Sequence, residues 1–163
     1  MNSLDRKVAL ISGAARGIGA ETARCMVAAG ARVVIGDVLL HEGQATADAL
    51  GDAAVFTPLD VTDPAQWDAA IALATARFGG LDILVNNAGL FLGRDFEEVT
   101  LEEWQKLAAV NLTGVWLGTK QAVPALKARG VDSAQGSAIV NLASVAGVVG
   151  SDLDPLYSMT KGG

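Results

Sequence analysis

The chain has only one cysteine, Cys25, so a disulfide within the chain is excluded. Because Cys25 falls within an expected helix, we predict a small core side chain rather than a reactive thiol. Histidine is equally scarce. His41 has no cysteine or histidine companion, which favours a solvated residue at a helix start over a metal ligand. No metal site is predicted.

Basic clusters and long apolar runs are also missing. Twelve lysines and arginines stand against eighteen acidic residues, and the resulting net charge of −6 argues against binding to nucleic acid. No apolar run is long enough to cross a bilayer, so no membrane association is expected. Residues 1–7 lack the apolar stretch of a signal peptide. These absences predict a soluble cytoplasmic protein.

Strand and helix signals alternate along the whole chain. The expected strands are residues 7–11, 32–35, 54–56, 81–85 and 138–142. The expected helices are residues 17–29, 42–50, 63–78, a long region from 100 to about 129 that is interrupted near Asn111, and a last helix from 155. Continuously apolar strands indicate burial on both faces. The pattern predicts one α/β domain over residues 1–163, with a doubly wound parallel sheet between two helical layers.

A glycine-rich segment joins the first expected strand to the first expected helix. Residues 12–19 read SGAARGIG, with glycines at Gly13, Gly17 and Gly19. Glycines let the turn close and let backbone N–H groups approach an anion, and the helix N-terminus adds positive potential. The spacing differs from the common Gly-x-Gly-x-x-Gly fingerprint, but its place between strand and helix predicts dinucleotide binding.

Asp37 follows the second expected strand, eighteen residues after Gly19. A carboxylate at this place can accept hydrogen bonds from both hydroxyls of an adenosine ribose, and it repels a 2′-phosphate. This favours NAD over NADP. Arg16, in the glycine loop, could meet a 2′-phosphate, so NADP stays an alternative.

Two further segments follow the third and fourth expected strands. Asp60-Val61 ends the third strand, and Asn86-Asn87-Ala88-Gly89 ends the fourth. Ligands of such sheets bind at the carboxyl ends of the strands, so Asp60 could reach an adenine amino group while the second turn lines the cofactor. Each segment could also be a simple turn at a strand end.

Tyr157 and Lys161 are four residues apart near the end of the chain. On a helix capped by Asp154 and opened by Pro155 they share one face. An ammonium beside a tyrosine favours the phenolate and lowers the tyrosine pKa from about 10, which makes a proton donor. The same pair is common on exposed helices, so it does not identify a site alone.

Ser144 and Asn111 each have a functional and a structural reading. Ser144 follows the fifth expected strand, and its hydroxyl could donate to a carbonyl oxygen held between it and Tyr157. Asn111 interrupts a helix, where it could hold a water near Lys161 or be only a residue at a kink.

Together these motifs resemble those of the short-chain dehydrogenase/reductase family in order and spacing. The resemblance covers the whole chain, and Ser12 stands where a threonine is usual and keeps its hydroxyl. It implies a Rossmann fold and an oxidoreductase that transfers a hydride between NAD(H) and a small secondary alcohol or ketone. The segments at 33–38 and 113–118 look most like bacterial NAD-dependent 3α(20β)-hydroxysteroid dehydrogenases, which makes a hydroxysteroid a candidate substrate. A homotetramer is also implied.

The resemblance also implies roles for individual residues. Tyr157 would exchange a proton with the substrate oxygen, Ser144 would hold that oxygen, Lys161 would bind the nicotinamide ribose, and Asn111 would support a water relay. Substrate contacts are therefore expected from Ser144 and Tyr157. The implied cofactor contacts are Gly13, Arg16, Gly17, Ile18, Gly19, Asp37, Asp60, Val61, Asn87, Ala88, Gly89, Tyr157 and Lys161.

Family members continue past this point with a longer Tyr-Lys helix, a sixth strand, a cofactor loop, a substrate lid and a seventh strand. We therefore expect a C-terminally truncated fold that lacks its last two strands. A first alternative function is a non-catalytic dinucleotide-binding fragment, poorly soluble because its last strand is an exposed apolar edge. A second is an NADPH-dependent 3-oxoacyl reductase, against which Asp37 argues.

Overall fold

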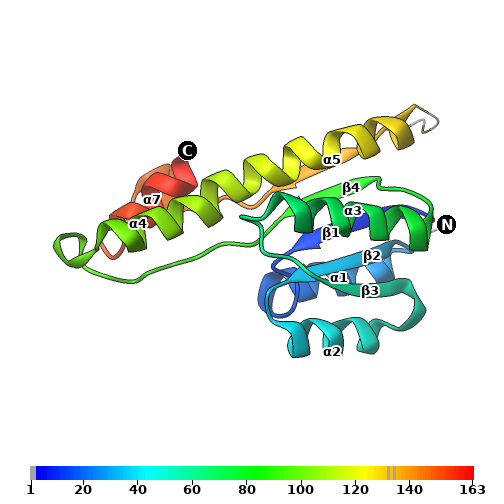
Figure 1. Cartoon of the computed structure of the whole chain (residues 1–163), viewed down its shortest axis with the longest axis horizontal. Coiled ribbons are helices and arrows are strands. Elements are labelled where there is room, and N and C mark those ends of the chain that lie inside the picture. Colours follow the sequence, from blue (N-terminus) through cyan, green and yellow to red (C-terminus); the bar gives the residue numbers. More distant parts are fainter. Residues whose placement is uncertain (1–2, 132, 134) are drawn as a thin grey trace.

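The computed structural model describes residues 3–131, 133 and 135–163, and residues 1 and 2 of the N-terminal segment lie outside that description (Figure 1). Five parallel strands form one sheet in the order β3-β2-β1-β4-β5. The strands are β1 (Val8–Ser12), β2 (Arg32–Asp37), β3 (Ala54–Pro58), β4 (Ile83–Asn86) and β5 (Ala138–Asn141). The order reverses direction at β1, so β1 and β4 mark the switch point where such sheets bind ligands.

Helices cover both faces of the sheet, which confirms the predicted α/β fold. Two helices lie on one face, α1 (Gly17–Ala28) and α2 (Leu40–Leu50), and two on the other, α3 (Pro64–Phe78) and α5 (Gly114–Gly130) (Figure 1). Near the carboxyl ends of the strands, α7 (Pro155–Gly162) packs beside α4 (Leu101–Ala108). Shorter helical segments are η1 (Gly51–Ala53), η2 (Phe96–Glu98) and α6 (Ala146–Val149).

Alternating residues of the strands divide the core into two layers. Leu10 of β1 packs with Trp67 of α3 and Leu117 of α5 in one buried cluster. Ile11, its neighbour, packs with Ala23 of α1 in the other cluster. Because side chains of a strand point alternately to opposite faces, a strand buried on both faces is apolar on both, as β1 is from Val8 to Ile11.

The long helical region is interrupted where the sequence predicts. A π-helical segment, η3 (Ala109–Thr113), separates α4 from α5 and contains Asn111, whose side chain is buried. Single π-helical turns widen a helix locally and occur often at functional sites. Here the turn directs Asn111 inward, toward α7.

The prediction for Cys25 is wrong, and the one for His41 agrees with the structure. Cys25 lies in α1 as expected, but its side chain is exposed, because Ala20 and Ala23 form the face that packs on the sheet. His41 is an exposed residue in the first turn of α2. Among the helices of the described ranges, none is long and apolar enough to cross a membrane.

A buried carboxylate at the amino end of the sheet joins β1, β4 and α5. Asp82 Oδ2 accepts the backbone N–H of Val8 at 2.9 Å and lies 3.2 Å from Arg129 Nη2, while its Oδ1 lies 3.7 Å from Lys7 Nζ. The carboxylate is almost fully buried, whereas both cations reach solvent. Asp82 therefore supplies the acceptor for a buried backbone N–H.

Replacing Asp82 by alanine should lower the free energy of unfolding by about 2–3 kcal/mol, because it leaves the Val8 N–H buried without an acceptor. Chemical denaturation of the purified protein measures this change. The matched control is Asp68→Ala, since Asp68 is exposed and accepts only from Gln121; it should change the free energy by less than about 0.5 kcal/mol. Equal losses in the two variants would contradict the role of Asp82.

Candidate functional site

The glycine loop between β1 and α1 packs directly on the turn after β4. Gly13 has a φ of +66°, which glycine adopts without strain, and a Cβ at this position would come within 2.7 Å of the Ala88 Cα. Asn87 Nδ2 donates to the carbonyl oxygens of Ser12 at 2.9 Å and Gly13 at 2.8 Å. A larger residue at 13 would push the two turns apart, so these contacts fix the relative position of the ends of β1 and β4.

The N-terminus of α1 faces the space beside these turns. Arg16 is the N-cap residue and makes no side-chain capping hydrogen bond, and Gly17 begins the helix with a φ of +60°. Uncapped N–H groups and the helix dipole favour an anion here. Gly19 is buried, and a Cβ there would collide with the Gly13 carbonyl oxygen. Small residues thus leave the backbone open to a phosphate group.

Asp37 ends β2 with a carboxylate held by two backbone N–H groups. Its Oδ2 accepts from Ala15 at 2.9 Å and its Oδ1 from Leu39 at 3.0 Å. Only 7% of the residue is exposed, and it lines the same space as the glycine loop. The carboxylate is therefore fixed beside the glycine loop, bonded to the residue that precedes the N-cap of α1.

A cavity of about 630 Å³ joins these features along the carboxyl ends of β1, β2, β3 and β4. Of the predicted cofactor contacts, nine line it: Gly13, Arg16, Gly17, Asp37, Asp60, Val61, Asn87, Ala88 and Gly89. It is also lined by residues that the sequence analysis did not identify: Val38, Leu39, Leu59, Leu90, Lys106 and Val110. Most of these are apolar residues next to a motif, and only that adjacency could have indicated them.

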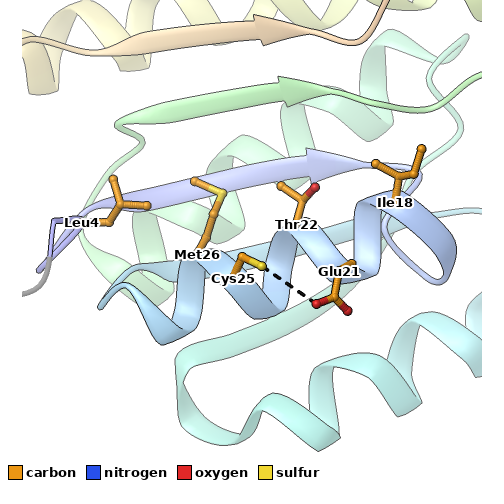
Figure 2. Close-up of a pocket in the computed structure, with 6 residues that line it drawn as sticks. All are labelled: Leu4, Ile18, Glu21, Thr22, Cys25 and Met26. Carbon is orange, nitrogen blue, oxygen red and sulfur yellow. Dashed lines mark hydrogen bonds between the residues drawn. The ribbon is translucent and has the colours of Figure 1, made fainter. Parts of the chain in front are cut away.

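The side chain of Ile18 does not line this cavity. It is 71% exposed and lies on the outer face of α1, where it lines a shallow depression of about 420 Å³ with Leu4, Cys25 and Met26 (Figure 2). The only polar contact drawn there joins Cys25 Sγ to Glu21 Oε1 at 3.9 Å. This open depression shares no lining residue with the larger cavity, and Glu21 is the one charged residue among those that line it.

Asp60 and the turn after β4 are braced by local hydrogen bonds. Asp60 Oδ1 accepts from the N–H of Thr62 at 2.9 Å and from its hydroxyl at 2.8 Å. Asn86 Nδ2 donates to Asn141 Oδ1 at 2.9 Å and so ties β4 to β5. Asp60 is one of the residues that line the cavity.

Tyr157 lies in the first turn of α7, with its ring half-buried. Asp154 caps the helix by accepting the N–H of Tyr157 at 2.8 Å, and Pro155 begins it, as predicted. The ring packs edge-to-face against Phe91, with centroids 5.3 Å apart and an interplanar angle of 86°. Lys161 Nζ lies 5.8 Å from the Tyr157 ring centroid, so helical geometry does place the cation beside the tyrosine.

Lys161 connects α7 to the end of β5 and to the turn after β4. Its Nζ donates to the Leu142 carbonyl oxygen at 2.8 Å. A Cβ on Gly89, a cavity residue, would lie 3.5 Å from both Lys161 Nζ and Asn111 Oδ1. Partial burial lowers the pKa of the Lys161 ammonium below its usual value, because desolvation penalises the charged form.

The Asn111 side chain links the chain after β4 to α7. Its Oδ1 accepts the N–H of Leu90 at 2.8 Å, and its Nδ2 donates to the Leu90 carbonyl at 2.9 Å and to Thr160 Oγ1 at 3.0 Å. Asn111 therefore holds the chain after β4 against α7.

Ser144 follows β5 and begins the turn into α6. Its Oγ accepts the N–H of Ala146 at 3.2 Å, and within the described residues no hydrogen bond joins it to Tyr157. The helix that follows packs closely on α7, because a Cβ on Gly147 would collide with the Lys161 carbonyl oxygen. Ser144, Tyr157 and Lys161 thus belong to one compact unit of α6 and α7.

The cavity fits a nicotinamide dinucleotide. It combines a glycine cradle that Cβ atoms would fill, an uncapped helix N-terminus for a pyrophosphate and a fixed carboxylate for ribose hydroxyls. In the part of the chain that the structure covers, no group of three or more histidine, cysteine or acidic side chains gathers as a metal site.

Known proteins with similar sequences and structures agree with this geometry. A 3-alpha-(or 20-beta)-hydroxysteroid dehydrogenase of Mycobacterium tuberculosis is 50% identical over 95% of this chain and 58% of its own length. A trans-4-hydroxycyclohexanecarboxylate dehydrogenase of Sinomonas cyclohexanicum is 46% identical over 96% of this chain and 62% of its own. The crystal structure of a 3-ketoacyl-(acyl-carrier-protein) reductase from Brucella melitensis with NADH superposes with a TM-score of 0.94, at 38% identity, over 98% of this chain and 66% of that one.

The chain spans about three fifths of the length of these curated relatives. The sequence profile of the short chain dehydrogenase family matches residues 7–163, which is nearly the whole chain. With the sheet order, the glycine cradle and the Tyr157–Lys161 pair, this match shows that the chain belongs to the short chain dehydrogenase family.

Proposed function

We propose that the full-length protein oxidises a secondary alcohol, or reduces the corresponding ketone, with NAD(H) as the cofactor. The observation that carries this proposal is the Tyr157–Lys161 pair on one face of α7, with the Lys161 ammonium next to Gly89 of the cavity. The cofactor, when bound, supplies or accepts the hydride. The chain would supply the binding, the orientation and the proton.

In this proposal Tyr157, Lys161, Ser144 and Asn111 have different roles. The Tyr157 phenol gives a proton to the substrate oxygen in reduction and takes one in oxidation. The Lys161 ammonium places a positive charge beside that ring and donates to cofactor ribose hydroxyls. The Ser144 hydroxyl donates to the substrate oxygen. Asn111 supports the relay by fixing Leu90 and Thr160 around Lys161.

Asp37 supports a preference for NAD over NADP. Its carboxylate is fixed by two N–H groups and lines the cavity, so a 2′-phosphate would bring two negative charges together. Arg16 lines the same cavity and offers the only argument for NADP. The NADH named for the Brucella melitensis structure is consistent with the proposed cofactor.

The substrate is proposed from the relatives. Proteins named for hydroxysteroids and for a hydroxycyclohexanecarboxylate are 50% and 46% identical to this chain, so we propose a cyclic secondary alcohol, of which a hydroxysteroid is one candidate. A 3-oxoacyl reductase is the second candidate, favoured by the TM-score of 0.94 and disfavoured by Asp37 where NADPH is required. A single dinucleotide-binding domain, a homotetramer and a cytoplasmic location remain predictions from the sequence.

Tyr157→Phe in the full-length protein should abolish turnover of a 3α-hydroxysteroid or of trans-4-hydroxycyclohexanecarboxylate, because the proton donor is gone. NAD should still bind with an affinity within about twofold of the wild-type value, since the ring remains. Turnover is followed by NADH absorbance, and binding by calorimetry. Ser158→Ala, on the same helix, should keep the wild-type rate. Substantial turnover by the phenylalanine variant would refute the role of Tyr157.

Asp37→Ser should shift the ratio of NAD to NADP affinity by about tenfold or more toward NADP, because it removes the repulsive charge and keeps a short hydrogen-bonding group. Parallel titrations with the two cofactors measure the ratio. Asp52→Ser changes an exposed acid in η1 and should leave the ratio unaltered. An unchanged ratio in the Asp37 variant would remove the argument for NAD.

A further inference from the structure

Asp154 is the most buried carboxylate among the described residues, at 1% exposure, and it does more than cap a helix. Its Oδ1 accepts the N–H of Tyr157 at 2.8 Å, as an N-cap does. Its Oδ2 accepts the N–H of Leu92 at 3.1 Å and that of Gly93 at 3.0 Å. These two bonds cross 61 and 62 positions of the sequence and join α7 to the loop after β4.

The other Asp-Pro helix start of this chain shows what capping alone requires. Asp63 caps α3 by accepting the N–H of Ala65 at 2.8 Å, and Pro64 follows it. Its second oxygen accepts from Gln66, a neighbour in the same helix. The two carboxylate oxygens of Asp63 therefore bind residues of its own helix, whereas one carboxylate oxygen of Asp154 binds a loop that is distant in the sequence.

Two buried polar side chains hold consecutive parts of that loop. Asn111 binds both the N–H and the carbonyl of Leu90, and Asp154 binds the N–H groups of Leu92 and Gly93. Phe91 lies between the two anchors, and its ring meets Tyr157 edge-to-face at 5.3 Å. Phe91 is itself 60% exposed, so the anchored backbone and not core packing determines where its ring lies.

We propose that Asp154 is a positioning residue: its carboxylate clamps Leu92 and Gly93 onto the N-terminus of α7 and thereby sets the place of the Tyr157 ring against Phe91. This inference rests on the proposed function only where it concerns turnover. Loss of the clamp frees Phe91 and Tyr157 together, so the substrate oxygen meets a misplaced phenol. The cofactor cavity includes neither Asp154 nor the residues that it binds, Leu92 and Gly93. Leu90, which does line the cavity, is held by Asn111, so we expect cofactor affinity to change little when the clamp is lost.

Asp154→Asn is the sharpest test, because it replaces one oxygen by an NH₂ group and leaves the size unchanged. With Oδ1 kept for the cap, the new NH₂ group faces two N–H donors and cannot accept from them. Asp154→Ser is the second variant, since a serine caps the helix well but is too short to reach the loop. Asp63→Asn makes the same chemical change at the matched helix start and is the control.

Three measurements on the full-length protein test whether Asp154 holds the loop in place. Hydrogen exchange of the peptide covering residues 90–95 should accelerate about tenfold or more in both Asp154 variants. With 3-fluorotyrosine incorporated, the ¹⁹F resonance that is missing in Tyr157→Phe should shift or broaden. The kcat for trans-4-hydroxycyclohexanecarboxylate should fall about 10- to 100-fold, while the NAD dissociation constant stays within about twofold. Asp63→Asn should change none of these.

The outcomes separate this proposal from the proposed function. Unchanged exchange and an unchanged ¹⁹F resonance in Asp154→Asn would overturn the clamp. A loss of kcat matched by equal losses of NAD affinity and of global stability would also overturn it, because a merely structural residue behaves in that way. If the wild-type protein turns over none of the tested alcohols, the proposed function fails, and the exchange and ¹⁹F results still decide whether Asp154 clamps the loop.

Discussion

The close contact between the glycine loop and the turn after β4 is the constraint on which the site depends. Gly13 lies against the Ala88 backbone, and Asn87 bonds two carbonyl groups of the loop. These contacts need a residue without a side chain at 13 and an amide at 87. They leave the N-terminus of α1 and the carboxylate of Asp37 at the rim of one cavity. Dinucleotide binding is therefore a consequence of how the ends of β1 and β4 meet.

The same turn carries the reaction site. The chain leaves β4 through Gly89 and is held by Asn111 at Leu90 and by Asp154 beyond it. Both anchors are buried. Asn111 donates to Thr160 of α7, and Asp154 caps α7, so both link the loop to that helix. The segment after β4 thus contributes residues to the cofactor cavity and also contacts the Tyr157–Lys161 pair. This arrangement brings residues that are far apart in the sequence to one proposed reaction site.

The sequence allowed the fold to be predicted from strand and helix alternation, because a parallel sheet needs apolar strands and regular crossovers. The motifs that follow the first four strands indicated nine of the cavity residues, since ligands of such sheets bind at the carboxyl ends of the strands. Periodicity did not predict that Cys25 is exposed, because α1 packs through alanines. The partners of Asn111 and Asp154 were also missed, since their contacts cross 21 to 62 positions. Such contacts exist only in the folded chain.

The central claim is that this chain supports hydride transfer between NAD(H) and a secondary alcohol or ketone, with the proton moved by Tyr157. Deuterium transfer tests it most directly. The full-length protein is incubated with NADH that carries deuterium at both C4 positions of the nicotinamide and with a 3-oxosteroid, and the product is analysed by mass spectrometry. The account predicts one deuterium on the carbinol carbon of the alcohol formed, and none when Tyr157→Phe replaces the wild type. Ketone reduction without deuterium in the alcohol, or equal transfer by the variant, would contradict it.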